Sequence, residues 1–537
     1  MDAVAELLNR LDESPPENPL ALRRMKIRIA GETGAGMIRN DALLARYRAD
    51  VAHGSRSRSE RLERALRLNA VRSHSGIATV TVITKPFPCP GRCVYCPTEA
   101  RAPKSYLTNE PAMRRAVRNE YDPFRQVSSR LEALADTGHA TDKIELIVKG
   151  GTWSFYPEDY QVEFIQRCFE AATAFGLEHQ NGHPATRDTL DAAQRANETA
   201  ASRIIGLTIE TRPDYIAPEE LRRLRRLGVT RVELGVQTLD EAVLALTVRD
   251  HGTAEVRTAT RLLKDAAFKV AYHLMPNLPG ATPDGDLASM RRLFDDPAYQ
   301  PDAIKIYPCV VIESAELYQW WRDGRHRPYD DETLIELLAA MKALAPPHVR
   351  IERVIRDIPS TSIRAGCAVT NLREEVHRRM RARGQACRCV RCRQVQGDAA
   401  GAFTLVRREY GASDGTEMFL SMEDADSDRL ASLLRLRRPS PSAWRALGLP
   451  ALEGAALIRE LHSYGPHLAL HERRESAVQH QGFGRRLLQE AERIAREEFG
   501  AERLAVISGI GAREYYRKLG YALSGTYMVK ALPGAPT

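Results

Sequence analysis

Three cysteines stand close together near residue 90. Cys89, Cys93 and Cys96 have the spacing CxxxCxxC and follow an apolar, β-branched run. This spacing lets three thiolates of one loop bind a single metal cluster, and three ligands on a four-iron cluster leave one iron open to another molecule. The alternatives are a zinc knuckle that lacks its fourth ligand, or three unconnected thiols. The pattern favours a [4Fe-4S] cluster with an open iron.

A second group of cysteines lies in an arginine-rich stretch, residues 372–396. Cys387, Cys389 and Cys392 have the spacing CxCxxC, which is one thiolate short of a closed tetrahedral zinc site. Cys309 ends a strand-like run and is the candidate for the fourth ligand. Because four thiolates leave no open position on the ion, we predict a structural zinc that ties this loop to the rest of the chain. A redox disulfide is the alternative.

Glycine and polar residues end three later strand-like runs. In parallel α/β sheets such residues gather at the carboxyl ends of the strands, where these folds place their ligands. We therefore expect them to bind a cofactor beside the first cysteine group, although a plain turn or a buried polar network would need similar residues. They are Gly150, Gly151, Thr152, Glu210, Arg212 and Gln237.

Near the C-terminus a glycine-containing segment opens a predicted helix. Its backbone N–H groups and the helix N-terminus can hold a pyrophosphate, and its small residues allow close approach. A strand-like run over residues 455–462 precedes it, and Tyr515 and Tyr516 follow it. Another kind of phosphate-binding loop is the alternative. The segment consists of Gln479, His480, Gln481, Gly482, Phe483, Gly484 and Arg485.

The elements that position these residues alternate regularly over residues 76–310. Short β-branched runs there alternate with helical stretches, which implies a parallel sheet, either open and doubly wound or closed into a full or partial barrel. We predict helices over residues 1–75, a linker with the zinc-binding loop over 311–396, and a smaller α/β domain over 397–537. The predicted strands are Ala78–Thr84, Ile144–Lys149, Ile204–Ile209, Arg231–Val236, Lys269–His273 and Ala303–Tyr307.

Length and composition restrict the class of protein. A chain of 537 residues with 43% hydrophobic and 28% charged residues is typical of a soluble protein of two or three domains. No window approaches about 18 uninterrupted apolar residues, so we expect no membrane span, and the N-terminus lacks the pattern of a secretory signal. The nine cysteines are clustered and odd in number, which favours metal binding in a reducing cytoplasm over a disulfide framework.

The first cysteine loop resembles that of the radical S-adenosylmethionine (SAM) superfamily. In that family the open iron binds SAM, and an electron from the cluster cleaves SAM to methionine and a 5′-deoxyadenosyl radical. Gly150–Thr152 corresponds to the family's glycine-rich element beside the methionyl amino group. The segment 479–485 resembles the acetyl-CoA element of the GNAT-family N-acetyltransferases, and Tyr516 takes the position of their tyrosine that protonates the CoA thiolate.

Together the two halves resemble the family of the catalytic subunit of Elongator and its stand-alone prokaryotic relatives, the tRNA carboxymethyluridine synthases. The resemblance covers nearly the whole chain and includes Gly150–Trp153, Glu210–Asp214, Met275–Gly280 and Glu460–His462. It implies an α/β chain with a radical SAM partial (βα) barrel, a zinc-bound loop and a C-terminal acetyltransferase domain. It also implies that the enzyme binds a tRNA anticodon stem-loop and needs an electron donor.

The same resemblance implies roles for further residues. Glu460, Leu461 and His462 join the acetyl-CoA element, and Tyr515 stands beside the catalytic position of Tyr516. Lys104, just past the cluster, is expected to help hold the anticodon loop or acetyl-CoA. The net charge of +8 and a pI near 9.0 fit a polyanionic partner, and the segments Arg56–Arg72 and Arg373–Arg393 are candidate phosphate contacts. The first segment is amphipathic, since Leu62, Leu66 and Leu68 stand among its arginines, and a solvated helix face is the alternative for it.

The implied reaction explains why one chain carries both halves. Carbon 5 of the wobble uridine is not basic and the methyl of an acetyl thioester is not electrophilic, so their joining to form 5-carboxymethyluridine requires a hydrogen atom to be removed from that methyl. A protein lysine acetyltransferase with a structural iron–sulfur barrel would explain the acetyl-CoA element but not an open iron. A non-catalytic RNA-binding scaffold would explain only the charge.

Overall fold

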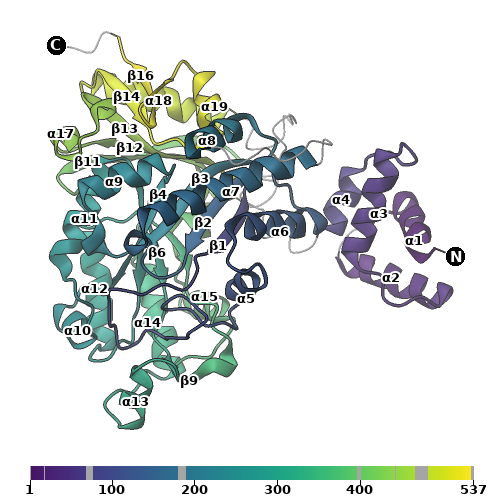
Figure 1. Ribbon diagram of the computed structural model, residues 1–537, viewed down its shortest axis with the longest axis horizontal. Coiled ribbons are helices and arrows are strands. Elements are labelled where there is room, and N and C mark those ends of the chain that lie inside the picture. Colours follow the sequence, from purple (N-terminus) through teal and green to yellow (C-terminus); the bar gives the residue numbers. More distant parts are fainter. Residues whose placement is uncertain are drawn as a thin grey trace.

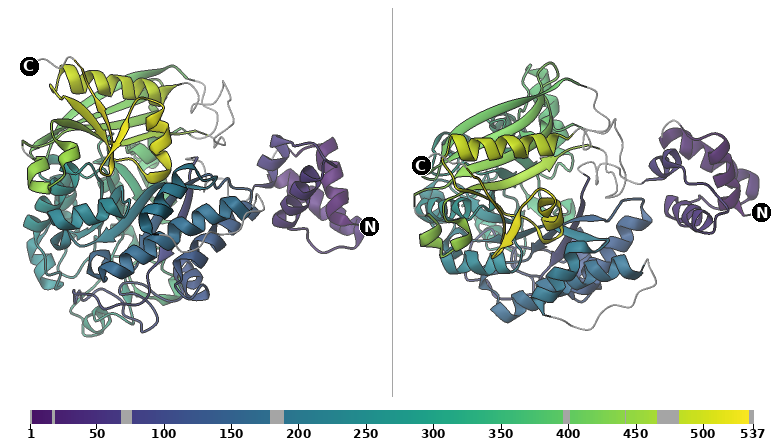
Figure 2. Two further views of the ribbon diagram at one scale, coloured as in Figure 1. Left: turned by 45° about the horizontal axis from the view of Figure 1, so that its top comes forward. Right: turned by 90° about the horizontal axis from the view of Figure 1, so that it is seen from above.

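The computed structural model describes residues 2–16, 19–67, 76–178, 189–395, 401–441, 443–465 and 482–533. Figure 1 shows a small helical bundle at the N-terminus, set to one side of a large α/β body. In that body a parallel sheet with its helices lies against a second sheet formed by the C-terminal part of the chain (Figure 2). Within the described residues, no helix has the length and apolar character needed to cross a membrane.

The N-terminal bundle packs around its own leucine-rich core. Leu62 and Leu66 are buried in that core with Tyr47, which confirms the predicted amphipathic segment. The bundle reaches the rest of the chain through Arg48 and Arg67, whose side chains donate to the backbone oxygens of residues 135 and 138. Its helices are α1 (Ala3–Glu13), α2 (Pro19–Thr33), α3 (Asn40–Ala52) and α4 (Glu60–Leu66).

Seven parallel strands form the first sheet, in the order β1-β2-β3-β4-β5-β6-β8, and give a half barrel. All six predicted strands are present, and none of their ends differs from the prediction by more than two residues. The seventh strand lies past residue 310, so the predicted boundary of the barrel was placed too early. The strands are β1 (Ala78–Ile83), β2 (Lys143–Lys149), β3 (Arg203–Thr211), β4 (Arg231–Gln237), β5 (Lys269–Leu274), β6 (Ala303–Ile306) and β8 (Arg350–Arg353).

Helices follow the strands and cover the outside of the half barrel (Figure 1). Most of them share one large core with the strands, as expected where a parallel sheet is buried, whereas α5, α10 and α13 belong to two smaller clusters. These helices are α5 (Pro111–Arg118), α6 (Pro123–Asp136), α7 (Glu158–Glu178), α8 (Leu190–Thr199), α9 (Pro218–Arg226), α10 (Glu241–Leu246), α11 (Thr253–Asp265), α12 (Pro283–Asp295), α13 (Leu317–Arg322) and α14 (Asp331–Ala343).

The segment predicted as a linker contains more structure than expected. Besides α14 and β8, it holds a small antiparallel pair and two helices, of which the second and the residues just before it carry the second cysteine group. It therefore completes the half barrel rather than only connecting two domains. These elements are β7 (Val311–Ile312), β9 (Ile363–Ala365), α15 (Leu372–Ala382) and α16 (Val390–Arg393).

The C-terminal domain is a mixed sheet with its own core. Its strands have the order β10-β11-β12-β13-β14-β16-β15, and β13 and β14 form the parallel pair within otherwise antiparallel neighbours. They are β10 (Phe403–Ala412), β11 (Gly415–Asp424), β12 (Arg429–Arg438), β13 (Ala455–Ser463), β14 (Arg503–Val506), β15 (Ala522–Ser524) and β16 (Tyr527–Ala531). The helices are α17 (Ala443–Leu447), α18 (Phe483–Glu497) and α19 (Arg513–Arg517).

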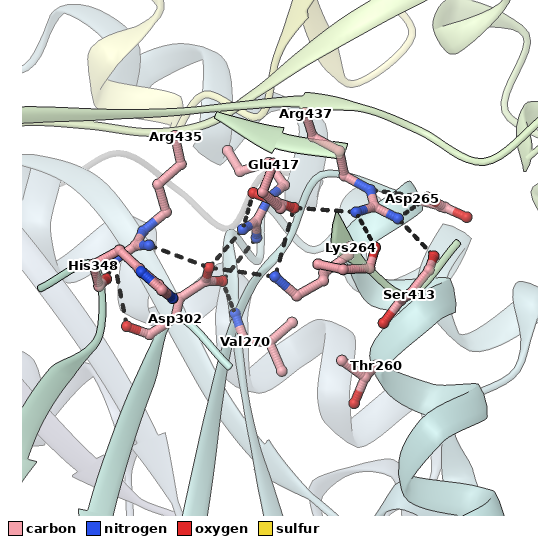
Figure 3. A network of polar contacts seen from close by, with 12 residues as sticks. Thr260, Lys264, Asp265, Val270, Asp302, His348, Ser413, Glu417, Arg435 and Arg437 are labelled. Carbon is pink, nitrogen blue, oxygen red and sulfur yellow. Dashed lines mark hydrogen bonds and ion pairs between the residues drawn. The ribbon is translucent and has the colours of Figure 1, made fainter. Parts of the chain in front are cut away.

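Buried ion pairs join the two sheets (Figure 3). Arg459 of β13 lies 2.5 Å from Asp302 of the barrel and 2.8 Å from Glu417 of β11. Lys264 and Arg435 lie 3.6 Å from the same Asp302. Each of these side chains is no more than 3% exposed. Because separating the sheets would leave charges buried without partners, the two domains are held as one unit.

Candidate active site

The first cysteine loop lies at the carboxyl end of the half barrel, after β1. Cys93 is buried, Cys89 and Cys96 are half-buried, and all three are free thiols. The loop is docked on the segment after α10 by a 3.2 Å hydrogen bond from the Val94 N–H to the Thr247 carbonyl. A hydrogen bond with Cys96 and the charge of Arg249 lower the pKa of Cys93 to about 5, against the effect of burial. The loop thus presents a ready thiolate.

The Gly-Gly-Thr element meets this loop, as predicted. Gly150 and Gly151 have φ values of +123° and +61°, which favour glycine, and a side chain at position 150 would overlap the Thr84 hydroxyl. The Thr152 hydroxyl lies 3.7 Å from the Cys89 sulfur. Three free thiols on one loop, with the Thr152 hydroxyl of the Gly-Gly-Thr element beside one of them, fit a three-cysteine iron–sulfur cluster with a ligand on its open iron.

Arg212 and Gln237 each offer an unsatisfied buried polar atom near this loop. Arg212 forms two hydrogen bonds of 2.8–2.9 Å with Asp214, while its remaining nitrogen lies against Gly91 of the cysteine loop, 3.6 Å from the Asp250 carboxylate, and has no hydrogen-bond partner within the described chain. Gln237 ends β4 at a φ of +73°, and its buried side-chain oxygen also lacks a partner there. Orphaned buried groups at strand ends are expected where a polar ligand completes the site.

Glu210 belongs to a buried ionic cluster inside the half barrel. It lies 3.1 Å from Lys149 and 3.0 Å from His273, which in turn lies 2.8 Å from Glu233. Burial opposes ionisation of Glu210, but the charges of His273 and Lys149 outweigh it and lower its pKa. Lys305 also binds Glu233, at 2.5 Å. Since both carboxylates are already neutralised by lysines, the cluster is suited to polar contacts with a substrate rather than to a metal ion.

Sequence reasoning missed most of this ionic cluster. Lys149, Glu233, His273 and Lys305 all lie inside strands that were recognised only for their apolar residues. The signal was present, since charged residues within buried parallel strands must face a polar interior. Tyr106 joins the cluster from the loop after the cysteines, with its hydroxyl 3.5 Å from Glu210.

Lys104 lies on that loop too, half-buried, and its ammonium donates to the Thr98 hydroxyl. It stands near the cysteines in the chain, but its hydrogen bond to Thr98 ties it to the loop itself. Its proposed part in holding the anticodon loop or acetyl-CoA remains a prediction.

The second cysteine group is compact. The sulfur atoms of Cys387, Cys389 and Cys392 all lie within 4.8 Å of one another. The predicted fourth ligand is wrong, because Cys309 is buried with Cys93 and Val94 at the carboxyl end of the barrel. The Val390 N–H instead donates to the Val349 carbonyl just before β8, at the opposite, amino end.

One further potential ligand lies beside Cys392, although it is not within 4.8 Å of all three sulfurs. The Nε2 atom of His377, on α15, lies 3.9 Å from the Cys392 sulfur. The Lys342 ammonium also lies 3.9 Å from the Cys392 sulfur. Burial and the neighbouring Lys342 lower the pKa of His377 to about 4, so its imidazole is neutral near pH 7. A neutral imidazole beside three thiols is a common ligand combination for zinc.

Several arginines that were predicted to contact phosphates are engaged within the protein. Arg56 is paired with Asp12 and Asp50, and Arg393 is buried against Glu423. The side chains of these arginines are therefore not available to a nucleic acid, which corrects the prediction at those positions. Arg61 is exposed, and its role as a phosphate contact remains a prediction.

The acetyl-CoA element is described only from Gly482 onward; Gln479, His480 and Gln481 lie outside the described residues. Gly482 is the N-cap of α18 at a φ of +71°, a conformation that favours glycine. Glycine brings no capping side chain, so the first N–H groups of the helix, at Phe483, Gly484 and Arg485, point toward whatever acceptor lies before it. This geometry suits a pyrophosphate.

Strand β13 presents its two sides to different partners. Leu461 and Ser463 approach Gly484 at the start of α18. Glu460 points the other way, toward the barrel, where it pairs with Lys269 at 3.2 Å and with Arg435 at 2.9 Å. His462 lines the same small cavity between the sheets as Glu460. Of the three predicted residues, Leu461 is thus the one whose side chain meets the acetyl-CoA element.

The two tyrosines differ in exposure. Tyr516 is only 7% exposed, and its ring packs in the domain core against Tyr521 and Tyr515. Tyr515 is 44% exposed, and its hydroxyl lies 3.6 Å from the place that a side chain on Gly484 would occupy. Tyr515 is therefore a second candidate for the group beside the CoA sulfur.

Comparisons with known families agree with this arrangement. The sequence matches the radical SAM superfamily over residues 88–293 and the Radical_SAM C-terminal domain over residues 301–382. Residues 474–521 match the acetyltransferase (GNAT) family. The first two ranges span the half barrel through α15, and the third spans α18 and the tyrosine pair.

Relatives match nearly the whole chain. The tRNA uridine(34) acetyltransferase of Dehalococcoides mccartyi is 48% identical over 86% of this chain and 99% of its own length. Elongator complex protein 3 of Homo sapiens is 42% identical over 87% of this chain and 86% of its own. The solved structure of the archaeal Methanocaldococcus infernus Elp3 with an N-terminal deletion is 40% identical, with a TM-score of 0.73, and covers 85% of this chain and all of that one.

Proposed function

This chain belongs to the family of the tRNA uridine(34) acetyltransferases and Elongator complex protein 3, and from that premise we propose how its own residues carry out wobble-uridine modification. It is an acyltransferase-class radical SAM enzyme that acts on tRNA. Its product is 5-carboxymethyluridine at the wobble position, with the carboxymethyl group derived from acetyl-CoA. The observation that carries this proposal is the joining of the two halves into one body by the buried pairs around Asp302.

The carboxyl end of the half barrel holds the radical site. Cys89, Cys93 and Cys96 would bind a [4Fe-4S] cluster, which together with SAM supplies a radical able to remove a hydrogen atom from a methyl group. Gly150 and Gly151 offer backbone groups beside that cluster, and the orphaned atoms of Arg212 and Gln237 offer further contacts for SAM. The cluster of Glu210 and His273 lies next to them and is suited to hold the polar edge of the uracil or the acetyl carbonyl.

The start of α18 holds acetyl-CoA. The N–H groups that follow Gly482 would donate hydrogen bonds to the pyrophosphate, and Leu461, which approaches Gly484, would lie alongside the acyl arm. Either Tyr515 or Tyr516 donates a proton to the CoA sulfur when the thioester is cleaved. Burial raises the pKa of both hydroxyls, which keeps them protonated near pH 7 and able to donate. Replacing each tyrosine separately by phenylalanine identifies the donor by its slower thioester cleavage.

The second cysteine group binds a structural zinc in this proposal. Cys387, Cys389 and Cys392 supply three ligands and His377 completes the site in place of Cys309. The ion would fasten α15 to the loop before α16, beside the end of the half barrel. Metal analysis distinguishes zinc from a second iron–sulfur site.

The remaining parts of the proposal concern partners. Exposed arginines such as Arg61 bind the tRNA backbone, and an external one-electron donor reduces the cluster. Free thiols in both cysteine groups, together with a tRNA substrate, favour the reducing cytoplasm.

The test is an assay of 5′-deoxyadenosine release by anaerobically reconstituted protein, with and without tRNA. We expect release that depends on both acetyl-CoA and tRNA. Acetylation of protein lysines without tRNA, unaffected by loss of the cluster, would instead establish the lysine acetyltransferase alternative. Binding of tRNA without release of either product would indicate the RNA-binding scaffold.

A further inference from the structure

We infer that Arg249 is a positioning residue that raises the reduction potential of the iron–sulfur cluster through its contact with Cys93. This inference rests on the proposed function, since it requires the cluster. Arg249 belongs to none of the motifs considered above. It lies on the loop between α10 and α11, far in sequence from the cysteines, yet its side chain reaches the cysteine loop.

The contact is direct and buried. The Arg249 guanidinium donates from Nη1 to the Cys93 sulfur at 3.4 Å, and Arg249 is 7% exposed. Its other donors are fixed as well, with Nη2 bound to the Gly235 carbonyl at 2.6 Å and Nε bound to His251 at 2.9 Å. Five N–H groups on a planar, permanently charged guanidinium suit such a three-way anchor. The cation is therefore held against one particular cysteine of the three.

The backbone on both sides of Arg249 is strained. Val248 has a φ of +55° and Asp250 a φ of +61°. Left-handed backbone is a rare state for a β-branched residue such as valine and costs on the order of 1–3 kcal/mol. The same loop receives the Val94 N–H of the cysteine loop at the Thr247 carbonyl. Such strain persists only where the surrounding structure fixes the backbone. Here the fixed residue is Arg249, which lies between Val248 and Asp250 and contacts Cys93.

Two neighbouring residues accommodate the Arg249 guanidinium. Gly235 leaves space for it, and His251 is neutral, so that Arg249 carries the charge. A side chain on Gly235 would come within 2.7 Å of the Arg249 Nη2 atom, so glycine at that position of β4 makes space for the guanidinium. Burial and the charge of Arg249 lower the pKa of His251 to about 4, so its ring stays neutral and accepts from Arg249. The nearby carboxylate, Asp250, is 3.6 Å from Arg212 instead.

The sign of the effect follows from electrostatics. Reduction adds one negative charge to the cluster, and a buried cation with a hydrogen bond to a ligand sulfur stabilises the more negative form. Arg249 should therefore raise the midpoint potential and make the cluster easier to reduce by the electron donor. If Arg249 only packed against the loop, its replacement would leave the midpoint potential of the cluster unchanged.

The experiment is an EPR-monitored redox titration of the reconstituted full chain, without acetyl-CoA or tRNA. Arg249→Met removes the charge and all of the N–H donors, and Arg249→Gln removes the charge but keeps a shorter, neutral side chain with an N–H donor. We expect the ratio of reduced to oxidised cluster at the wild-type midpoint to fall about tenfold in Arg249→Met, a shift of about 59 mV for a one-electron couple. Arg249→Lys keeps a cation and should shift the ratio less than either.

The matched control is Arg225→Met. Arg225 is an equally buried arginine whose guanidinium contacts the backbone oxygens of Val229 and Thr526, remote from the cysteine loop. It should leave the midpoint unchanged. The inference would be overturned if Arg249→Met or Arg249→Gln assembled its cluster and had the midpoint potential of the wild type. Failure of the wild-type chain to assemble a cluster would overturn the proposed function instead.

Discussion

The two cysteine groups of this protein use one residue type in opposite surroundings. Cys89, Cys93 and Cys96 lie at the carboxyl end of the half barrel, with buried Arg249 against the Cys93 sulfur and the Thr152 hydroxyl beside the Cys89 sulfur. The second group lies at the amino end, and its three sulfurs are within 4.8 Å of one another. A tetrahedral ion about 2.3 Å from each sulfur sets them about 3.8 Å apart, which suits the second group.

The difference shows that the position of a cysteine motif in the fold decides its chemistry. A site at the carboxyl ends of parallel strands can be reached by ligands and surrounded by residues from many loops. In the second site, three thiols from the segment with α16 and an imidazole from α15 would close the coordination of the ion. Such a site can only hold these elements together. We therefore assign the first group to the reaction and the second to the stability of the chain.

Cys93→Ala breaks this comparison with the largest effect. The variant should lose its cluster and form no 5′-deoxyadenosine and no modified uridine, because the radical site no longer exists. Acetyl-CoA affinity should remain within a few fold, since α18 is untouched. Iron content and product yield are the measurements, and retention of about four irons per chain at this site would contradict the assignment.

Cys389→Ala should act on stability instead. The loss of a buried ligand should lower the free energy of unfolding by about 3–5 kcal/mol, because metal binding contributes to folding. Protein that remains folded should still release 5′-deoxyadenosine. Cys367→Ala is the control, since that thiol is buried outside both groups and its loss should cost only about 1 kcal/mol. Equal melting temperatures of the two variants would count against a structural metal.

The pH dependence of zinc affinity sharpens the comparison. Hydrogen bonds with Cys389 and Cys392 raise the pKa of Cys387. Hydrogen bonds with Cys387 and Cys392 lower the pKa of Cys389. For Cys392 the bond to Cys387 lowers the pKa, but the bond to Cys389 and burial raise it overall. Zinc must therefore displace about two protons, and its affinity should fall about 100-fold for each unit that the pH falls between 8 and 6.

Calorimetric titration in buffers of different ionisation enthalpy counts those protons directly. His377 contributes none in this range, since its imidazole is already neutral above about pH 4. Zinc affinity that does not change with pH would show that the thiols are not the ligands.

Lys342→Met is expected to have the smallest effect. Lys342 is fully buried and lies 3.9 Å from the Cys392 sulfur. It is thus a buried basic residue next to a sulfur of the second group, as Arg249 is for the first group. Loss of this cation beside a zinc with three thiolates should weaken zinc binding about tenfold, as is usual for partners around metal ligands. Competition with a calibrated chelator measures it, and an unchanged affinity would remove the parallel with Arg249.

The sequence allowed the strands and both cysteine motifs to be predicted because each depends on local pattern. Six strands of the half barrel carry β-branched runs, but β8 was missed because Arg350–Arg353 is short and mostly charged. Cys309 was assigned to the wrong group because sequence spacing does not tell which end of a sheet a loop reaches.

Charged residues were harder to place than cysteines. Arg249 contacts a residue 156 positions away in the chain and His377 one 15 positions away, and nothing in their local sequence marks those contacts. Arg56 and Arg393 were expected on the surface, but a carboxylate elsewhere in the fold pairs with each of them. Pairing of charges is a property of the tertiary structure, and the net charge of the chain does not reveal it.

The central claim is that both halves act on a single acetyl group. Acetyl-CoA labelled with ¹³C at both acetyl carbons, incubated with reconstituted protein, SAM and tRNA, tests it by mass spectrometry of the digested tRNA. Wild-type protein should place both labelled carbons in wobble 5-carboxymethyluridine, and neither Cys93→Ala nor Gly482→Glu should place any. Label found only on protein lysines, or label in the wobble uridine made by Cys93→Ala, would contradict the account.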